Sequence, residues 1–497
     1  MATTVRLTAI TLENFKNVLH GTVRLSHPRQ RQPGSVLGLF GQNGSGKTAL
    51  LNAIGILRQC LAGAALPESL CDSVTAGKDF ARLAFEFLIA TDDESGAPVT
   101  VFYEFKIGGS AAARDPFSGM PVAAAALSTT IYDEKLSATL PGTNGKPRQS
   151  VIMDCSAGEP FTPAVKCKQL LGPDSGVRKT LAGFKAVALA ERKSFVFSHR
   201  LSQALQRQIE ARESRKEDSA ELALCRTVQA FLSRLRRYAQ QELFVIETAQ
   251  TGLIDLQALP LLAKCEETAT HPALTDIAGS LSLNLNGPSQ LPVALLGAID
   301  SLIARLNRVL IQIVPGVRIG LRHLATELDE QGREIATADL VSLKSEKPIS
   351  LRYESEGIKK LVSLLPLLIC VYNQRSVTVA IDALDAGIFE HLLGELLRLI
   401  SERGRGQLIF TAHDLRPLET LDKSCIAFTT TDPKNRYARV KNLKSTNNLR
   451  DTYFRELVLA PEAGGLCNAT SSAEIAAALR EAGRPFGELC EKSGQTQ

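Results

Sequence analysis

The pattern of apolar and polar positions predicts short buried strands that alternate with amphipathic helices. The runs "SVLGLF" (35–40), "VTVAI" (377–381) and "LIF" (408–410) are continuously apolar, which is typical of strands covered on both faces. The amino-terminal "VRLTAITLENFKNVLHGTVRLS" instead predicts two alternating strands about a loop at 14–17. "FARLAFEFLIATD" and "VTVFYEFKIGG" predict an antiparallel sheet between 80 and 108, and the small-residue-rich stretch that follows predicts a loop. The expected class is α/β.

Two helices with a heptad pattern are predicted in the middle of the chain. One stripe consists of Leu224, Val228, Phe231, Leu235 and Tyr238. The other consists of Leu295, Ile299, Leu302, Leu306, Val309 and Ile313. The two helices predict an antiparallel hairpin, as in a short coiled coil, or a small helical bundle. The alternative is two amphipathic helices packed on the head. Neither stripe is long enough for a chromosome-scale arm.

Composition places the chain among ordinary soluble globular proteins. It has 497 residues, 44% hydrophobic and 22% charged, which allows two or three packed units. No apolar run reaches the roughly 18 to 20 residues that span a bilayer, and the amino terminus lacks a signal-peptide layout. Ten cysteines without a CxxC pair predict reduced thiols rather than a zinc site or a disulfide frame. We therefore expect a cytoplasmic protein without membrane contact.

The positive charge is concentrated in one segment. Residues 178–237 hold 14 lysines and arginines against 6 aspartates and glutamates, whereas the rest of the chain holds 43 against 46. Such a segment is either a solvated helical face or a surface for DNA phosphates or an acidic protein partner. Aromatic residues make up 5% and tryptophan is absent, so a stacking platform for single strands is not indicated.

A phosphate-binding pattern follows the first buried strand. "GLFGQNGSGKTALLNAIGIL" contains GxxxxGK[ST] between the strand at 35–40 and a predicted helix at 48–60 with Leu50, Leu51, Ile54 and Leu57 facing inward. The glycines let backbone N–H groups turn toward phosphates, and the helix amino terminus adds partial positive charge. Lys47 is expected to reach the terminal phosphates and Thr48 to ligate magnesium. The residues assigned to nucleotide binding are Gly41, Asn43, Gly44, Ser45, Gly46, Lys47 and Thr48.

The start of the chain resembles a known class of ATPases. "ITLENFKNV" followed closely by "GQNGSGKTALLNAI" resembles the start of SMC/RecF-class ABC-type ATPases, a class that includes the overcoming-lysogenisation-defect family and many ATPases of prokaryotic defence systems. The resemblance implies an ABC-type ATPase head: a P-loop NTPase with a mixed sheet and an antiparallel lobe, using ATP and Mg²⁺.

The distal half contains the other motifs that this resemblance implies, in the expected order. "YESEGIKKLVSLLPLL" offers Ser355 and Gly357 as the S-x-G signature that faces the other subunit's nucleotide, although Ser355 also reads as an ordinary helix cap. "VTVAIDALDAG" resembles Walker B and the D-loop, with Asp382 on magnesium and Asp385 at the subunit interface. "GRGQLIFTAHDL" ends a strand at His413, the position that senses the γ-phosphate in this class.

Ala383 departs from the class pattern. The residue after the Walker B aspartate is normally a glutamate that polarises the attacking water, and a methyl group removes that general-base contribution of about 10²- to 10⁴-fold. The site is expected to bind ATP and turn it over slowly. Either ATP is a structural ligand, or the sequence carries an engineered glutamate-to-alanine change. A third alternative is that Asp385 or Glu390 acts as the base.

The spacing of the motifs predicts a divided head. More than three hundred residues separate Lys47 from Ser355, as in SMC-like proteins, so an insertion splits the head. The expected units are a first lobe with Walker A (1–177), a basic helical insertion (178–315), a second lobe (316–460) and a tail with one short helix (461–497).

The chain is expected to act with other proteins. Only 84 residues follow His413, and they hold no DxD pair, so the metal-binding Toprim nuclease of the overcoming-lysogenisation-defect family is not expected. The resemblance implies a homo-oligomer, at least a dimer, joined through its ATP sites. It further implies a sensor or scaffold for a separate nuclease effector, similar in kind to the ATPases of the PARIS and Septu anti-phage systems. The alternatives are a RecF-like repair factor that uses ATP as a clamp on DNA, and a scaffold with mainly protein contacts.

Overall fold

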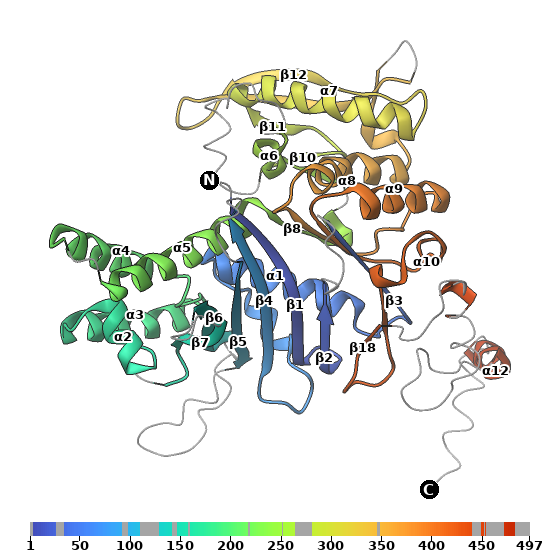
Figure 1. The fold of residues 1–497 in the computed structure, drawn as a ribbon. Helices are drawn as coiled ribbons and strands as arrows, with labels where there is room; N and C mark the ends of the chain where they lie inside the picture. Colours follow the sequence, from blue (N-terminus) through green and yellow to red (C-terminus); the bar gives the residue numbers. More distant parts are fainter. Residues whose placement is uncertain are drawn as a thin grey trace, which may run out of the picture.

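The computed structural model describes most of the chain (Figure 1). The described residues are 3–25, 34–91, 98–109, 129–141, 147–157, 160–216, 219–250, 252–263, 281–344, 348–439, 449–451, 453 and 472–482. The loop predicted after residue 108 lies almost wholly outside these ranges. Within them, no helix combines the length and the apolar character needed to cross a membrane.

An antiparallel sheet forms the first lobe. Its strand order is β2-β1-β4-β5-β6-β7, and every neighbouring pair is antiparallel. The strands are β1 (Thr3–Phe15), β2 (Val18–Arg24), β4 (Ala81–Thr91), β5 (Val99–Gly109), β6 (Thr129–Pro141) and β7 (Pro147–Asp154), with a 3-10 helix η1 (Glu68–Ser73) before β4. The predicted pair of amino-terminal strands and the predicted antiparallel sheet are both confirmed.

A second sheet, mostly parallel, carries the continuously apolar strands. Its order is β18-β17-β3-β16-β15-β8, and only β18 runs antiparallel to its neighbour. The strands are β3 (Ser35–Phe40), β8 (Leu243–Ile246), β15 (Thr378–Ile381), β16 (Gln407–Thr411), β17 (Ile426–Thr429) and β18 (Tyr437–Ala438). All residues of β15, β16 and β17 are buried, because helices and the first lobe cover both faces.

One hydrophobic core lies between the two sheets. Helix α1 (Lys47–Ala62) leaves β3 after the glycine loop and packs against α5 (Ala220–Gln241) and β1. The four residues predicted to face inward from α1 are all buried in this core: Leu50, Leu51, Ile54 and Leu57.

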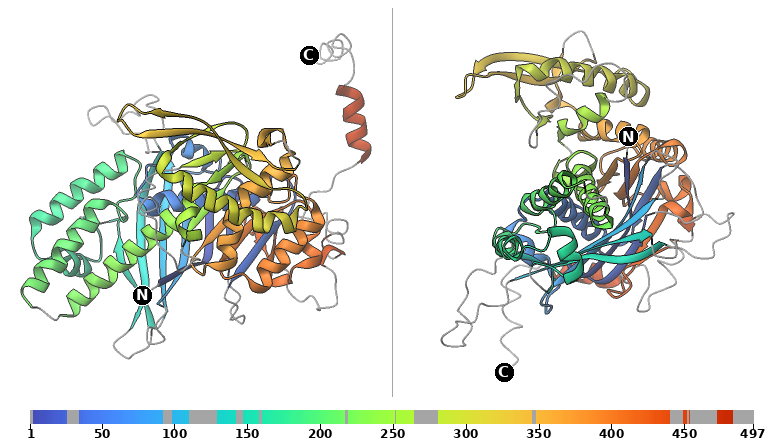
Figure 2. Two further views of the ribbon diagram at one scale, coloured as in Figure 1. Left: turned by 90° about the horizontal axis from the view of Figure 1, so that it is seen from above. Right: turned by 60° about the vertical axis from the view of Figure 1, so that its left-hand side comes forward.

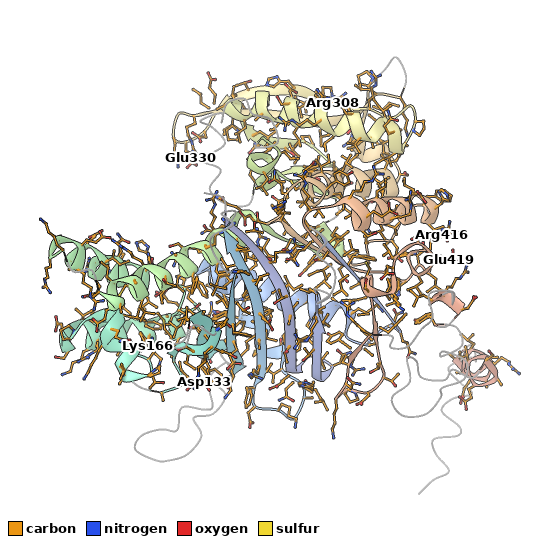
Figure 3. All side chains as sticks on the ribbon, in the orientation of Figure 1. Asp133, Lys166, Arg308, Glu330, Arg416 and Glu419 are labelled. Atoms are coloured by element: carbon orange, nitrogen blue, oxygen red, sulfur yellow. The ribbon has the colours of Figure 1, made fainter. Side chains whose placement is uncertain are left out.

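The opposite face of the parallel sheet carries a second core. Helices α8 (Glu356–Asn373) and α9 (Glu390–Arg403) cover the strands there, with α10 (Pro417–Thr420) beside α9. Above them lies a further layer, seen at the top of Figure 1, in which α7 (Leu296–Ile313) packs on a small sheet. The order of its strands is β11 (Ser289–Pro292), β13 (Glu334–Ser342) and β12 (Ile319–Leu328). The turn that holds Glu330 joins β12 and β13 at one end of this layer (Figure 3).

The remaining elements of this layer are short. They are β9 (Leu253–Asp255), α6 (Leu259–Ala263), β10 (Ser282–Asn284) and β14 (Ile349–Ser350). The 3-10 helices here are η2 (Thr248–Gln250), η3 (Leu256–Ala258), η5 (Val293–Leu295) and η6 (Leu351–Tyr353), and η7 (Lys423–Cys425) precedes β17.

A group of four helices extends from the side of the first lobe (Figure 2). It consists of α2 (Ala164–Leu171), α3 (Ser175–Ala190), α4 (His199–Ser214) and α5. Side chains of Asp174, Ser198 and Ser219 accept backbone N–H groups in the first turns of α3, α4 and α5, which fixes where each helix begins. The helix predicted in the tail is α12 (Ser472–Ala482).

The predicted insertion at 178–315 is not one helical unit. Its first boundary falls inside α3, and β8 in its middle belongs to the parallel sheet, paired with β15. The two heptad stripes lie on α5 and α7, which belong to different cores. The predicted hairpin, or short coiled coil, is therefore wrong: α1 and α4 already pack against α5, and α8 and β12 against α7. The alternative of two helices packed separately describes this protein.

Candidate functional site

The glycine loop between β3 and α1 has backbone geometry that side chains rarely adopt. Gly41, Gly44 and Gly46 have φ values of 152°, 74° and 97°. A Cβ atom on Gly41 would lie 2.0 Å from the Thr429 hydroxyl, so only glycine fits there. Helix α1 begins directly after this loop without a side-chain cap, which leaves its first N–H groups for an anion.

Lys47 is held at this loop by backbone oxygens. Its Nζ donates to the carbonyls of Gly41 (2.6 Å) and Gln42 (3.0 Å). Burial lowers the pKa of Lys47, and the nearby carboxylates of Asp382 and Asp385 act in the opposite direction. The ammonium is therefore placed where phosphate oxygens bound by the loop would meet it.

The loop is supported from behind by β17, β18 and the β1–β2 turn. The buried Tyr437 hydroxyl donates to the carbonyl of Gly46 (2.9 Å), and the hydroxyls of Ser45 and Thr429 form a hydrogen bond. Asn17 donates its side-chain amide to the carbonyl of Gly44. Ser45 thus has a structural contact, whereas Asn43 is exposed at the tip of the loop.

The two predicted magnesium ligands lie side by side. The Thr48 hydroxyl is 3.2 Å from Oδ2 of Asp382, although 334 residues separate them in the chain. Thr411 donates to Oδ1 of the same carboxylate (2.6 Å) and fixes its orientation. Among the described residues no group of three or more His, Cys, Asp or Glu could hold a metal alone. A hydroxyl and one carboxylate fit Mg²⁺, which commonly takes one or two protein ligands together with substrate phosphates and water.

Ala383 follows Asp382 in a left-handed turn. Its φ is 48°, a value uncommon outside glycine, asparagine and aspartate. Its N–H donates to the Thr411 hydroxyl (2.7 Å), and its carbonyl accepts from the Lys360 ammonium. Both backbone groups of this turn are therefore held in place, while the side chain is a methyl group that neither accepts a proton nor orients water.

Asp385 connects this turn to the end of β16. Its Oδ2 accepts the backbone N–H groups of His413 and Asp414, each at 2.7 Å. Its other oxygen is buried and has no hydrogen-bond partner among the described residues. The carboxylate therefore positions the turn that presents the exposed His413, which argues against a role as the general base. Glu390 is exposed at the start of α9.

The S-x-G residues lie at the amino terminus of α8. Ser355 is the N-cap and accepts from the N–H of Ile358 (3.4 Å), so the ordinary cap interpretation applies within this chain. Gly357 packs against the loop that follows Asp385: a Cβ atom there would lie 2.2 Å from the carbonyl oxygen of Gly387. The glycine is required by this contact.

Sequence reasoning missed Lys360, one turn further along α8. Its side chain is almost completely buried, and Nζ donates to the carbonyls of Ala383 and Ala386, the latter at 2.9 Å. Burial lowers the pKa of Lys360, with Asp385 and Asp382 acting against that shift. A signal was present, since a lysine pair directly precedes the apolar run of α8.

Glu247 was also missed, because β8 was expected inside a helical insertion. The backbone N–H of Asp382 donates to the carbonyl of Ile246 (2.9 Å), so Glu247 and Asp382 leave neighbouring parallel strands at the same edge. Glu247 is exposed and accepts from the side chain of Asn52 on α1 (3.4 Å).

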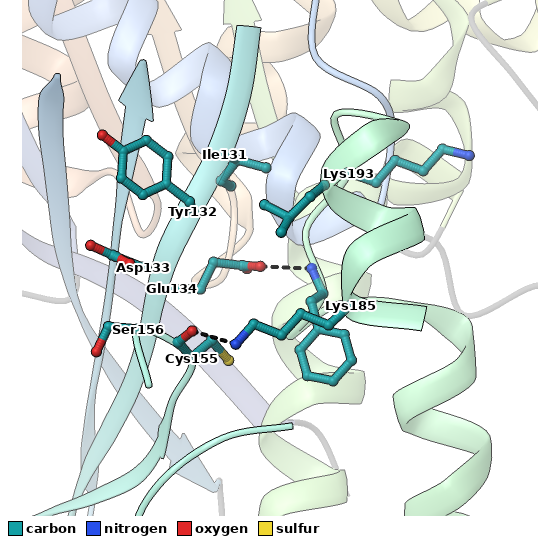
Figure 4. A pocket seen from close by; sticks show the side chains of 10 residues that line it. Ile131, Tyr132, Asp133, Glu134, Cys155, Ser156, Lys185 and Lys193 are labelled. Carbon is teal, nitrogen blue, oxygen red and sulfur yellow. Dashed lines mark hydrogen bonds between the residues drawn. The ribbon is translucent and has the colours of Figure 1, made fainter. Parts of the chain in front are cut away.

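A separate cavity in the first lobe does not belong to this site. It has a volume of about 240 Å³ and lies between β6 and α3 (Figure 4). Its buried carboxylate, Glu134, accepts from the Tyr103 hydroxyl (2.7 Å), the Ser194 hydroxyl and the N–H of Phe195 (2.6 Å). Burial raises the pKa of Glu134. These partners satisfy the group, so we assign it to packing.

The strand, glycine loop and helix, together with the acidic end of a parallel strand in the same sheet, have the arrangement of a P-loop nucleotide-binding fold. The parallel sheet with its antiparallel neighbour strand corresponds to the mixed sheet, and the first lobe to the antiparallel lobe. The predicted α/β class, with a mixed sheet and an antiparallel lobe, is confirmed.

Comparison with protein-family models and with curated protein sequences finds no match. Several solved structures are distantly similar. An SMC head bound to the C-winged helix domain of ScpA is 12% identical, over 88% of this chain and 97% of that chain, with a TM-score of 0.40. The SMC head from Thermotoga maritima is 13% identical, over 88% and 100%, with a TM-score of 0.33. The recombination mediator RecF with ATP is 12% identical, over 83% and 95%, with a TM-score of 0.33.

Proposed function

We propose that this chain is an ABC-type ATPase that binds Mg-ATP at residues 41–48 and assembles through shared ATP sites. The observation that carries the proposal is the contact between the Thr48 hydroxyl and the Asp382 carboxylate beside the uncapped start of α1. In the complex, Lys47 and the loop N–H groups neutralise the phosphates, and Thr48 and Asp382 hold Mg²⁺.

The other half of each site comes from a second copy. Ser355 and Gly357 begin a helix of 18 residues whose first N–H groups suit a phosphate. Since these residues and the glycine loop lie on separate elements of one chain, a symmetric pair of copies completes two sites at once. Bound ATP then joins the copies, and hydrolysis separates them.

Turnover is expected to be slow. Ala383 provides no proton acceptor beside Asp382, and Asp385 is occupied by two backbone N–H groups. The nucleotide is therefore retained, and the assembled state is long-lived.

The test is mass photometry of the purified chain with and without Mg-ATP, beside Lys47→Ala and the control Lys179→Ala on the exposed face of α3. We expect a discrete ATP-dependent assembly in the parent chain and the control, and none in Lys47→Ala. An identical assembly in all samples without nucleotide would contradict the proposal.

We further propose that the assembled head senses an invader and regulates a separate nuclease effector in antiviral defence. The resemblance of its motifs to ATPases of defence systems supports this role. Affinity purification of the chain from its native operon tests this idea. A co-purifying nuclease that the Lys47→Ala chain fails to control is expected, and purification of the chain alone would contradict it.

A second candidate is a RecF-like ATPase that clamps DNA. The basic segment favours it, because α3 and α4 expose Lys179, Arg200 and Arg207. Duplex binding that strengthens with ATP and weakens steeply with salt would support this function over the first.

A further inference from the structure

Two exposed aromatic rings flank the loops that meet at the start of α8. We call residues 353–357 together with 385–389 the apex, since the contact between Gly357 and Gly387 joins them. Tyr353 is 69% exposed and Phe389 is 71% exposed. Among the described residues, the only other exposed phenylalanine or tyrosine is Tyr372, which is 37% exposed and lies near the opposite end of α8.

Both rings are held in a fixed orientation by their neighbours. The guanidinium of Arg352 lies 4.7 Å from the centre of the Tyr353 ring and donates to its hydroxyl (2.7 Å). Phe389 stacks on His391, with ring centres 6.2 Å apart. Rings held in this way lose little conformational entropy when a partner covers them, and buried Tyr and Arg anchors dominate the energy of many interfaces.

The charges around the apex are complementary to those around the glycine loop. Glu356 lies at the apex with a side chain that is 84% exposed and pairs with the ammonium of Lys359, and the exposed Glu390 directly follows the apex. Around the glycine loop, Lys16 is exposed beside Asn17, and Lys434 is exposed two residues before Arg436, which donates to the carbonyl of Asn17. Two copies placed apex to glycine loop would therefore bring opposite charges together, which favours encounter in that orientation.

We propose that Tyr353 and Phe389 are the aromatic anchors with which one copy of this chain docks on the glycine-loop face of a second copy. This inference rests on the proposed function and adds the residues that supply the binding energy of the assembly. The exposed rings adjoin Ser355 and Gly357, so the surface they form is continuous with the face proposed to complete the partner's ATP site.

The test compares Tyr353→Ala and Phe389→Ala with Tyr372→Ala, which removes an exposed ring near the end of α8 away from the apex. Sedimentation with Mg-ATP gives the dissociation constant of the assembly, and a fluorescent ATP analogue gives nucleotide affinity at concentrations where the chain is monomeric. We expect each apex variant to raise the dissociation constant at least about thirtyfold, with unchanged nucleotide affinity and thermal midpoint. Tyr353→Phe should keep most of the assembly, because the ring remains.

The outcomes separate the two proposals. If the parent chain assembles with Mg-ATP, Lys47→Ala does not, and the apex variants assemble like Tyr372→Ala, the anchor assignment is overturned while the ATP-driven assembly stands. If the parent chain itself does not assemble with Mg-ATP, the proposed function fails and the anchors fail with it.

Discussion

At the scale of single residues, the site proposed to bind Mg-ATP lacks a carboxylate directly after Asp382. Asp382 is oriented by Thr411 and faces Thr48, and the backbone groups of Ala383 are fixed by Thr411 and Lys360. A turn held on both sides, with a left-handed φ at a residue other than glycine, is the kind of conformation that surrounding structure imposes at functional sites. The turn is thus built to present a side chain, and alanine presents none that can act on water.

Replacing Ala383 by glutamate is therefore expected to raise ATP turnover by about 10²- to 10⁴-fold, because a carboxylate at this position would supply a general base. The assembly formed with Mg-ATP should then disappear as ATP is consumed. Phosphate release and mass photometry on the same sample measure both effects. Ala383→Gln is the control, and equal rates for the two variants would show that position 383 is not the base position.

Lys360 gives a second prediction at this scale. Lys360→Met removes the cation that joins α8 to the carbonyls of Ala383 and Ala386, leaving two acceptors without their donor at a cost of about 1–3 kcal/mol. We expect weaker ATP-driven assembly, because the turn after Asp382 loses the ammonium of α8 that holds its carbonyl groups. The control is Lys359→Met, a neighbouring buried lysine that donates to Asn286 and pairs with Glu356 instead of holding the Asp382 turn. Equal assembly in both variants would exclude a specific role for Lys360.

At the scale of elements, local patterns predicted most strands and helices, and non-local pairing decided what they missed. β3, α1, β15 and β16 follow from continuous apolar runs and from a helix with one buried face. β8 has only four residues between a long helix and irregular structure, and its place beside β15 depends on pairing across more than a hundred residues. Glu247 could not be assigned without that pairing.

The heptad stripes show the same limit. A stripe specifies that a helix buries one face, and α5 and α7 both do so. It does not specify the covering element, which here belongs to a different core for each helix. The site residues were predictable because their motifs are local, whereas the contacts of Lys360 and of Gly357 arise only when α8 meets the loop after β15.

The buried carboxyl group of Glu134, on β6 beside α3, gives a prediction on how the stability of the fold depends on pH. Burial raises the pKa of Glu134 in the folded state above its value in the unfolded chain. The folded protein therefore holds this proton more tightly than the unfolded chain does, and the resulting stabilisation is complete at a pH below the unfolded-state pKa. Its contribution should decline as the pH rises through the folded-state pKa. Urea unfolding across pH 4 to 8 should show this decline in the parent chain and not in Glu134→Gln. A matching pH profile for the variant would assign the dependence to other groups.

At the scale of the whole molecule, the charge distribution separates the two candidate functions. The basic helices α3 to α5 extend from the side of the first lobe, whereas the apex lies on elements of the second core (Figures 1 and 2). A DNA clamp needs both surfaces, because ATP closes the assembly and the basic helices hold phosphates. A regulator of a protein effector needs the ATP sites and has no requirement for phosphate contacts on α3 and α4.

Reversing charges on the basic helices therefore discriminates between these functions. Lys179→Glu combined with Arg207→Glu should leave Mg-ATP assembly unchanged in either case, since both side chains are exposed on α3 and α4, which pack chiefly on β6, α2 and α5. If the chain clamps DNA, the double variant should lose duplex affinity, and the slope of log affinity against log salt should fall by about 2. Arg308→Glu on α7 is the control, because it reverses an exposed charge in the upper layer (Figure 3). The effector function instead predicts weak duplex binding with a small salt slope in all three proteins. Strong duplex binding that is lost in the Lys179→Glu, Arg207→Glu variant and kept in Arg308→Glu would support the clamp. The positive surface of α3 and α4 would then be the part of the protein that contacts the phosphates of the duplex.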